Sequence, residues 1–169
     1  MTLLGAWTLP FFFSDFERHI GTSVTHAISC RALRSFSKTL SVSTKDRFQL
    51  IDVTESVEKI VSESNVENGL CLVHASHATA AVVCNENENG LIHDILRRVR
   101  ELFPPSAGYL HDRIDNNASS HIASSLIGAS RMFPIENGRL VRGTWQNIFL
   151  LELDGPRSRR LLSVHIIGE

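Results

Sequence analysis

Residues 131–141 read RMFPIENGRLV, with Asn137-Gly138 between two short runs of strand-forming residues. Asn-Gly readily supplies the two positive φ angles of a type I′ turn. The stretch therefore predicts a β-hairpin whose strands cover residues 131–135 and 139–141.

Further apolar runs on both sides of this hairpin predict the rest of the sheet system. Residues 36–42 alternate between apolar and polar side chains, which is typical of a half-buried strand. The other predicted strands cover residues 47–53, 69–74, 80–84, 147–153 and 161–167. Short turns separate many of these runs, which favours about seven strands in largely antiparallel sheets.

About three helices complete an α+β fold. Residues 91–102 have apolar side chains at i, i+3 and i+4, and Pro104-Pro105 ends this segment. Thr54 is expected to cap a helix whose inward stripe is Val57, Ile60 and Val61. A third helix is predicted from Ile122, Leu126 and Ile127, which are spaced for one helical face, with Asn117 or Ser119 as its cap.

Composition restricts the class of protein. A chain of 169 residues suffices for one domain, and a formal net charge of −1 gives no reason to expect nucleic acid or an anionic membrane as partner. No apolar run approaches the length of a membrane span. Cys30, Cys71 and Cys84 are odd in number and lack CxxC spacing, which fits a reducing compartment, and we expect a cytoplasmic protein.

Residues 1–34 do not match the pattern that follows them. Residues 3–13 (LLGAWTLPFFF) are apolar. A secretory signal requires a basic residue before such a run, and this chain has none there. Asp15 and Glu17 argue against a mitochondrial presequence. We interpret residues 1–34 as an N-terminal extension of uncertain order and residues 35–169 as the folded domain.

Residues 109–130 (YLHDRIDNNASSHIASSLIGAS) place His111 and His121 on either side of a polar loop. A loop histidine that faces a helix histidine brings two imidazoles around one point. Neutral imidazole is the commonest metal ligand, and a third histidine would complete an open, catalytic-type site. The alternative is that both histidines are ordinary surface residues.

Two further residues stand at the ends of predicted strands. His77, in SHATA, is exposed enough to react and rigid enough to be placed accurately. Its alternative is a turn histidine bonded to nearby backbone. Glu86, in NENENG, is a candidate general base or partner of a metal ligand, and its alternative is a solvated loop carboxylate.

Two polar clusters are candidates for substrate binding. In Gly143-Thr144-Trp145-Gln146, Trp145 is placed to wall a pocket and Gln146 to orient a polar group, while the alternative is a tryptophan packed in a corner. Arg157, Arg159 and Arg160 are candidates for phosphate contacts. Alternation along a strand prevents all three arginines from pointing the same way, and a solvated hairpin tip is the alternative.

These segments together resemble the YjbQ-like family, also called the secondary thiamine-phosphate synthase family. GTWQ followed at short range by ELDGPR is the strongest single signal, and the resemblance extends from about Ser35 to Glu169. The other matching segments are SKTLSVST, SHATA, NENEN, YLHD, NASSHIASSLIGAS, ENGRLVRGTWQNI, ELDGPRSRR and the closing IIGE.

The resemblance implies an α+β protein that assembles as a homotrimer, with a pocket lined by His77, His111 and His121. It also implies a divalent metal ion, zinc or magnesium, at these histidines. Two positions depart from the family pattern: Ala78 replaces a threonine, and Arg142 replaces a leucine before GTWQ. A lost hydroxyl hydrogen bond costs about 1 kcal/mol, too little to abolish a three-histidine site.

The activity that the family name implies couples a hydroxymethylpyrimidine pyrophosphate to a thiazole phosphate. A phosphorylated small molecule is then the expected partner. Glu86 would move a proton, Trp145 and Gln146 would hold a ring, and Thr144, Arg157 and Arg159 would bind substrate. A metal-dependent hydrolase and a non-enzymatic trimeric metal- or metabolite-binding protein are the alternatives.

Overall fold

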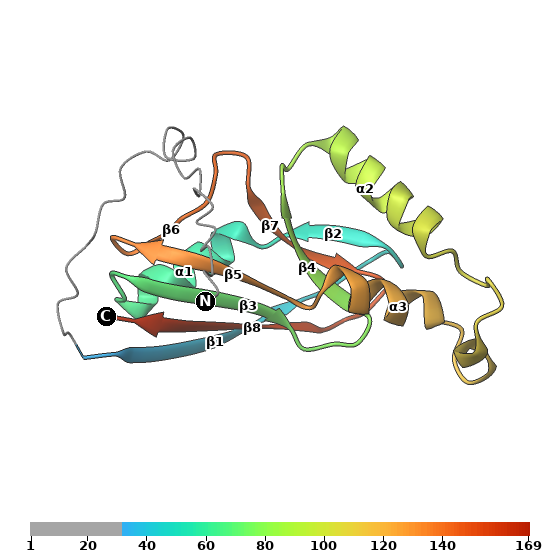
Figure 1. Ribbon diagram of the computed structural model, residues 1–169, viewed down its shortest axis with the longest axis horizontal. Coiled ribbons are helices and arrows are strands. Elements are labelled where there is room, and N and C mark those ends of the chain that lie inside the picture. The colour runs from blue at the N-terminus through green and yellow to red at the C-terminus, as the bar shows by residue number, and fades with distance from the viewer. Residues whose placement is uncertain (1–31) are drawn as a thin grey trace, which may run out of the picture. The chain divides into compact units, whose positions relative to one another are not determined.

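The computed structural model describes residues 32–169, so nearly all of the predicted extension lies outside the described residues. The described part is α+β and its strands pair antiparallel, as predicted (Figure 1). Its helices are α1 (Thr54–Ser64), α2 (Asn89–Leu102), the short 3-10 helix η1 (Leu110–Arg113) and α3 (Ala118–Ile127). Its strands are β1 (Arg34–Val42), β2 (Gln49–Asp52), β3 (Gly69–Ala75), β4 (Ala80–Asn85), β5 (Ser130–Glu136), β6 (Arg139–Leu140), β7 (Asn147–Glu152) and β8 (Arg160–Gly168).

The strands form two sheets. One has the order β1-β8-β3-β5-β6 and the other the order β2-β7-β4. The predicted hairpin joins β5 to β6, and Asn137 and Gly138 have φ angles of 50° and 71°. The left-handed backbone that Asn-Gly favours is therefore present at this turn.

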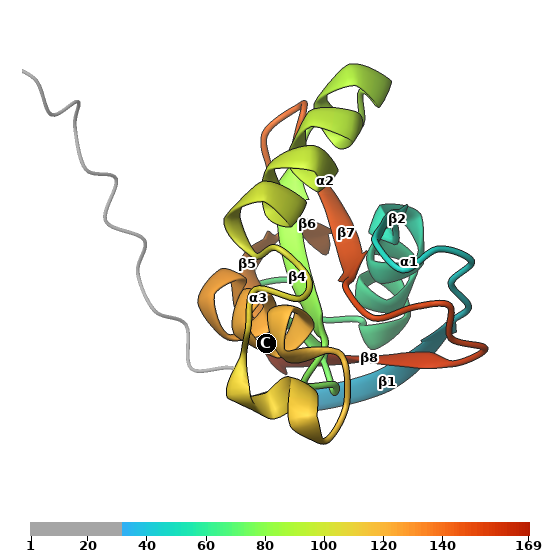
Figure 2. The same cartoon turned by 90° about the vertical axis from the view of Figure 1, so that its right-hand side faces the viewer.

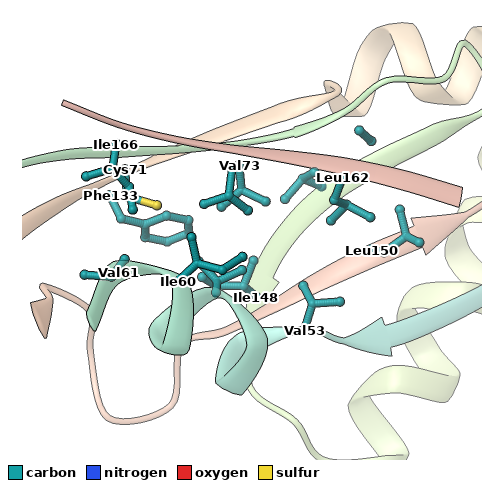
Figure 3. Close-up of a cluster of buried hydrophobic side chains, with 14 of the residues drawn as sticks. Val53, Ile60, Val61, Cys71, Val73, Phe133, Ile148, Leu150, Leu162 and Ile166 are labelled. Atoms are coloured by element: carbon teal, nitrogen blue, oxygen red, sulfur yellow. The ribbon is translucent and has the colours of Figure 1, made fainter. Parts of the chain in front are cut away.

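A first hydrophobic core lies on the inner face of the five-stranded sheet (Figure 3). The predicted stripe of α1, Val57, Ile60 and Val61, is buried there against both sheets. Alternate residues of β3 and β8 point into this core, as the two-residue period of a strand requires.

A second core lies between the three-stranded sheet and the helices α2 and α3. In Figure 2, α1 and α3 lie on opposite sides of that sheet. Ala81 and Leu151 from the sheet pack with Val99 of α2 and Ala123 of α3. The predicted amphipathic helix α2 packs shallowly, because Val99 is its one buried residue.

The predicted helix caps need correction. Thr54 is the first residue of α1, and its backbone N–H and hydroxyl both donate to Oδ1 of Asp52. Asn117 holds the N-cap position of α3, but Oδ1 of Asp112 accepts the Ala118 N–H instead. In both cases a carboxylate accepts the helical N–H, and a charged acceptor is stronger than a hydroxyl or an amide.

The outer face of the five-stranded sheet is not covered by any residue from 32 to 169. Leu70, Met132 and Ile167 are 42%, 59% and 45% exposed on this face. They border a shallow groove of about 270 Å³. The described residues include no helix long and apolar enough to cross a membrane.

Candidate functional site

His111 and His121 lie next to each other, as the sequence predicts. Their rings meet edge to face, with 4.9 Å between centroids. His111 follows the start of η1 and is exposed, whereas His121 is half-buried in the first turn of α3. The side-chain hydrogen bonds among the described residues engage neither ring, so the imidazole nitrogens remain available.

The loop between the two histidines is held by hydrogen bonds to neighbouring segments. The buried Asn117 donates from Nδ2 to Asp115 Oδ2 at 3.0 Å and to Asp154 Oδ2 at 3.2 Å. Arg47 donates to the backbone oxygen of Asn116 at 3.0 Å. These contacts fix the loop against α3 and the β7–β8 turn, and so place the histidine pair.

His77 lies in the β3–β4 connection and has a different environment. Its Nε2 accepts the Leu161 N–H at 2.6 Å, which is the backbone contact named above as the alternative. Partial burial, followed by the charge of Arg160, lowers the pKa of His77 below its usual value. A neutral ring that accepts through Nε2 keeps its proton on Nδ1.

The described residues contain no group of three or more His, Cys, Asp or Glu side chains arranged to hold a metal ion. A catalytic zinc site requires about three protein ligands. One chain therefore supplies the pair His111 and His121 but not a complete donor set. The shared three-histidine site stays a prediction.

The predicted arginine cluster divides into three environments. Arg160 is buried and donates from Nε to Glu152 Oε2 at 2.6 Å and from Nη2 to Thr79 Oγ1 at 3.0 Å. Arg157 pairs with Asp154 at 2.6 Å, and Arg159 is exposed. The three environments differ, but strand alternation is not the reason, because β8 begins at Arg160 and Arg157 and Arg159 precede it. The ion pairs of the described residues do not include Arg159.

Sequence reasoning missed Glu152, the last residue of β7, which pairs with Arg160 at the start of β8. It is fully buried, and its Oε1 also accepts the N–H groups of Leu153 and Asp154. Burial alone would raise its pKa, but hydrogen bonds from Arg160, from the Asp154 N–H and from Thr44 outweigh burial and lower the pKa. The signal in the sequence was a charged residue that interrupts the apolar run NIFLLEL.

Glu86, Thr144, Trp145 and Gln146 lie at the other end of the three-stranded sheet. Asn85 pairs with Asn147 in the β4–β7 register, so Glu86 and Gln146 leave the sheet side by side. Asp52 Oδ2, which the sequence analysis also missed, accepts from Asn87 and Asn147 at 2.8 Å each and ties the two loops together. Trp145 is 69% exposed and does not pack in a corner.

The segment GTWQ is braced from two sides. Gln146 Oε1 accepts the Gly143 N–H at 2.7 Å, so this amide is engaged within its own loop. Arg142 contacts Glu58 Oε1 through Nε at 2.8 Å and donates from Nη1 to the Gln146 backbone oxygen at 3.0 Å. Beside this loop lies an open cavity of about 650 Å³, within the size range of small-molecule sites. Its lining includes Glu58, Ser62, Arg139, Leu140, Arg142 and Thr144.

The two groups of predicted site residues are therefore separated within one chain. The segments of His77, His111, His121, Arg157 and Arg159 lie toward the end of the sheet where β4 begins and β7 ends, and those of Glu86 and GTWQ lie where β4 ends and β7 begins. Five residue steps along β4 correspond to about 17 Å. The lining of the cavity beside GTWQ accordingly includes none of the three histidines.

Residues 38–169 match the family model described as UPF0047 protein YjbQ-like. The chain belongs to the YjbQ-like family. A UPF0047 protein of Archaeoglobus fulgidus is 46% identical over 123 residues, which cover 73% of this chain and 95% of the relative. The YjbQ protein of Salmonella typhimurium is 36% identical over 128 residues, covering 72% and 92% of the two chains.

Solved structures of YjbQ-like proteins have the same fold. A crystal structure from Sulfolobus solfataricus, described as a YbjQ-like protein of unknown function, has a TM-score of 0.81 and 48% identity. The match covers 82% of this chain and 100% of the solved chain. A hypothetical protein from Aeropyrum pernix has a TM-score of 0.77 and 41% identity, and the match covers 79% and 99% of the two chains.

The two departures from the YjbQ-like pattern differ in consequence. Ala78 is exposed, and its neighbour Thr79 keeps the buried hydrogen bond to Arg160, so the missing hydroxyl leaves that contact intact. Arg142 instead adds an ion pair with Glu58 that a leucine could not make. The second departure changes how the GTWQ loop is held.

Proposed function

We propose that this YjbQ-like protein is a metal-dependent enzyme acting on a phosphorylated small molecule, with its reactive centre at His111 and His121. The observation that carries the proposal is the edge-to-face contact of two imidazoles with no hydrogen bond to the described part of the protein. Imidazoles left free in this way are suited to bind a metal ion or to carry a proton.

The reaction that we propose is the coupling named by the family resemblance. A thiazole nitrogen forms a C–N bond to the pyrimidine methylene carbon while the C–O bond to pyrophosphate breaks. The electron pair of that bond leaves with pyrophosphate, and nothing is oxidised or reduced. A divalent ion, zinc or magnesium, would stabilise the charge that grows on the leaving group.

Among the described residues, one chain supplies only two of the histidine donors that the metal ion would require. The residues around the pair have roles of their own. Asp112 fixes the start of α3 and so the position of His121. Arg157, oriented by Asp154, and the exposed Arg159 provide positive charge for a phosphate group.

A second candidate function is a trimeric metal- or metabolite-binding protein without turnover. The observation that favours it is the position of Glu86, the expected general base, at the other end of β4 from the histidine pair. A base must come within hydrogen-bond reach of the proton that it removes. Within one chain Glu86 cannot serve the histidine pair.

The homotrimer belongs to the same proposal, and the uncovered outer face of the five-stranded sheet supports it as one surface for packing of copies, in addition to the ends of the three-stranded sheet. The register aligns Ser35, Ile167, Leu70 and Pro134 in one row across this face. The next row is Ser37, His165, Leu72 and Met132. Neither row contains Asp, Glu, Lys or Arg, and such depletion of charge is typical of the centre of a protein interface.

Metal content tests the proposal. We expect His111→Ala and His121→Ala each to lose most of the zinc or magnesium that the purified full-length protein binds. His93→Ala is the matched control, because His93 is an exposed histidine of α2 that lies outside the pair. Elemental analysis that finds full metal in both pair variants would overturn the metal assignment.

Turnover separates the two candidate functions. The enzyme is expected to release pyrophosphate from the pyrimidine pyrophosphate when the thiazole phosphate is present, and His121→Ala should abolish that release. Binding of both compounds without pyrophosphate release favours the binding protein.

A further inference from the structure

The two ends of the three-stranded sheet carry complementary chemistry. The end defined by His111 and His121 has two free imidazoles, while its carboxylates Asp112, Asp115 and Asp154 all accept hydrogen bonds from the protein. The end defined by Glu86 and GTWQ has the cavity of about 650 Å³ and a loop carboxylate. Each end has groups that the other lacks.

Both ends expose large apolar side chains. Leu110 of η1, Ile114 directly after η1 and Leu126 of α3 belong to the segments that carry the histidine pair, and they are 73%, 85% and 72% exposed. Trp145 is 69% exposed at the opposite end. Val141, 42% exposed, precedes the GTWQ segment of Trp145. Groups of exposed apolar residues mark contact surfaces, and here they form two different surfaces on one chain.

Two different contact surfaces fit a ring of copies. A two-fold dimer uses the same patch twice, whereas a closed cyclic trimer joins one patch of each copy to a different patch of the next. Unpaired charges of both signs are available for such a junction. Arg113 and Arg159 at the histidine end are exposed and Glu86 at the GTWQ end is half-buried, and the ion pairs of residues 32–169 involve none of these three.

We infer that the active site is composite and forms between copies: His111 and His121 of one copy face Glu86 and Trp145 of the next. The cavity beside GTWQ then holds the body of the substrate, and the histidines of the neighbouring copy reach its reacting end. The inference rests on the proposed function for the identity of that substrate. It also brings to the histidine pair the Glu86 carboxylate, which accepts no hydrogen bond from residues 32–169, unlike Asp112, Asp115 and Asp154.

Chemical cross-linking tests this contact without any assay of activity. Trp145→Cys and Leu110→Cys, each in the full-length chain, are co-expressed and treated with a short bis-maleimide. We expect a cross-linked pair of chains at several times the yield of either variant alone, which measures the background from the native cysteines. Ile114→Cys in place of Leu110→Cys is a second probe of the same surface.

Leu33→Cys is the matched control, because Leu33 is 73% exposed, like Leu110, but precedes β1. Equal cross-linking of Trp145→Cys to Leu33→Cys and to Leu110→Cys would overturn the composite site. So would light scattering that finds a monomer, or background yields with both Leu110→Cys and Ile114→Cys. Loss of metal from His111→Ala in a monomeric protein would overturn the composite site and leave the proposed metal site standing.

Discussion

Arg160 and Glu152 form a buried ion pair that joins β8 to the end of β7. Arg160 is 4% exposed and Glu152 is 0% exposed, and Nε of the arginine donates to Oε2 of the carboxylate at 2.6 Å. Thr44 donates to the same carboxylate oxygen at 3.0 Å and also accepts the Arg157 N–H. The segment ELDGPRSRR thus has a structural role that a search for phosphate ligands would overlook.

Breaking this pair is expected to destabilise the fold strongly. Arg160→Leu leaves Glu152 buried without its partner, and loss of one member of a buried pair costs about 3–5 kcal/mol. Arg157→Leu is the control, because Arg157 is half exposed and such pairs contribute about 1 kcal/mol or less. Urea unfolding measures both free energies. Similar losses for the two variants would contradict the assigned role of Arg160.

Stability should also depend on pH through Glu152. Its pKa in the folded protein is lowered from 4.5, so the folded state binds fewer protons than the unfolded state in acid. The stabilisation is complete above the unfolded pKa and is lost as the pH falls through the folded one. We expect the free energy of unfolding to fall below pH 4.5 and to fall less steeply in Glu152→Gln, as urea titrations at several pH values would measure.

His77 should make the free energy of unfolding depend on pH in a second, higher pH range. Its folded pKa is lowered from 6.5, because burial and the charge of Arg160 disfavour the imidazolium. A base with a lowered pKa reduces stability as the pH falls from its unfolded value toward its folded one. His77→Gln keeps an acceptor for the Leu161 N–H and removes the titration. If both proteins lose stability equally between neutral pH and the folded pKa of His77, another group is responsible.

Local patterns in the sequence were enough for the strands, the helices and the fold class, but not for the division into two sheets. Asn137-Gly138, the alternation in β1 and the stripe of α1 each report on short-range geometry, so hairpin, strand and helix could be predicted. The caps at Asp52 and Asp112 could not, because their acceptors reach across turns whose shape the pattern does not specify. The contact between His111 and His121 could be predicted, because only a short loop separates the two residues.

The grouping of site residues was harder to predict, because it depends on which ends of which strands meet. The motifs containing His77 and Glu86 are close in sequence, yet β4 separates them by its full length. A strand of six residues places its two flanking loops at opposite ends of the strand, on opposite sides of the sheet's length. Because the two motifs are close in sequence, a single site was expected. One chain instead has two separate groups of candidate site residues.

Arg142 should control the mobility of the GTWQ loop. Arg142→Leu restores the family residue but removes the contacts to Glu58 and to the Gln146 backbone oxygen. We expect faster amide hydrogen exchange at Gly143–Gln146 with little change in global stability, because half-exposed pairs contribute about 1 kcal/mol or less. Arg139→Leu is the control on the same cavity. Unchanged exchange in Arg142→Leu would mean that the Gln146 side chain alone holds the loop.

Two exposed arginines, one beside the cavity and one near the histidine pair, allow the position of phosphate binding to be tested. Arg139 lines the cavity of about 650 Å³ beside Thr144, and Arg159 follows the β7–β8 turn near the histidine pair. The ion pairs among the described residues include neither arginine. Both guanidinium groups are therefore available to a phosphate.

We expect Arg159→Ala to weaken binding of pyrophosphate to the full-length protein, because the leaving group belongs beside the histidine pair. A charged hydrogen bond contributes about 1.5–3 kcal/mol, which corresponds to a Kd raised roughly ten- to one-hundred-fold. Arg139→Ala should change the Kd for pyrophosphate little, since the cavity holds the body of the substrate. Isothermal titration calorimetry measures both constants. A larger rise in the Kd for pyrophosphate in Arg139→Ala than in Arg159→Ala would place the phosphate site in the cavity. The two ends would then have exchanged roles.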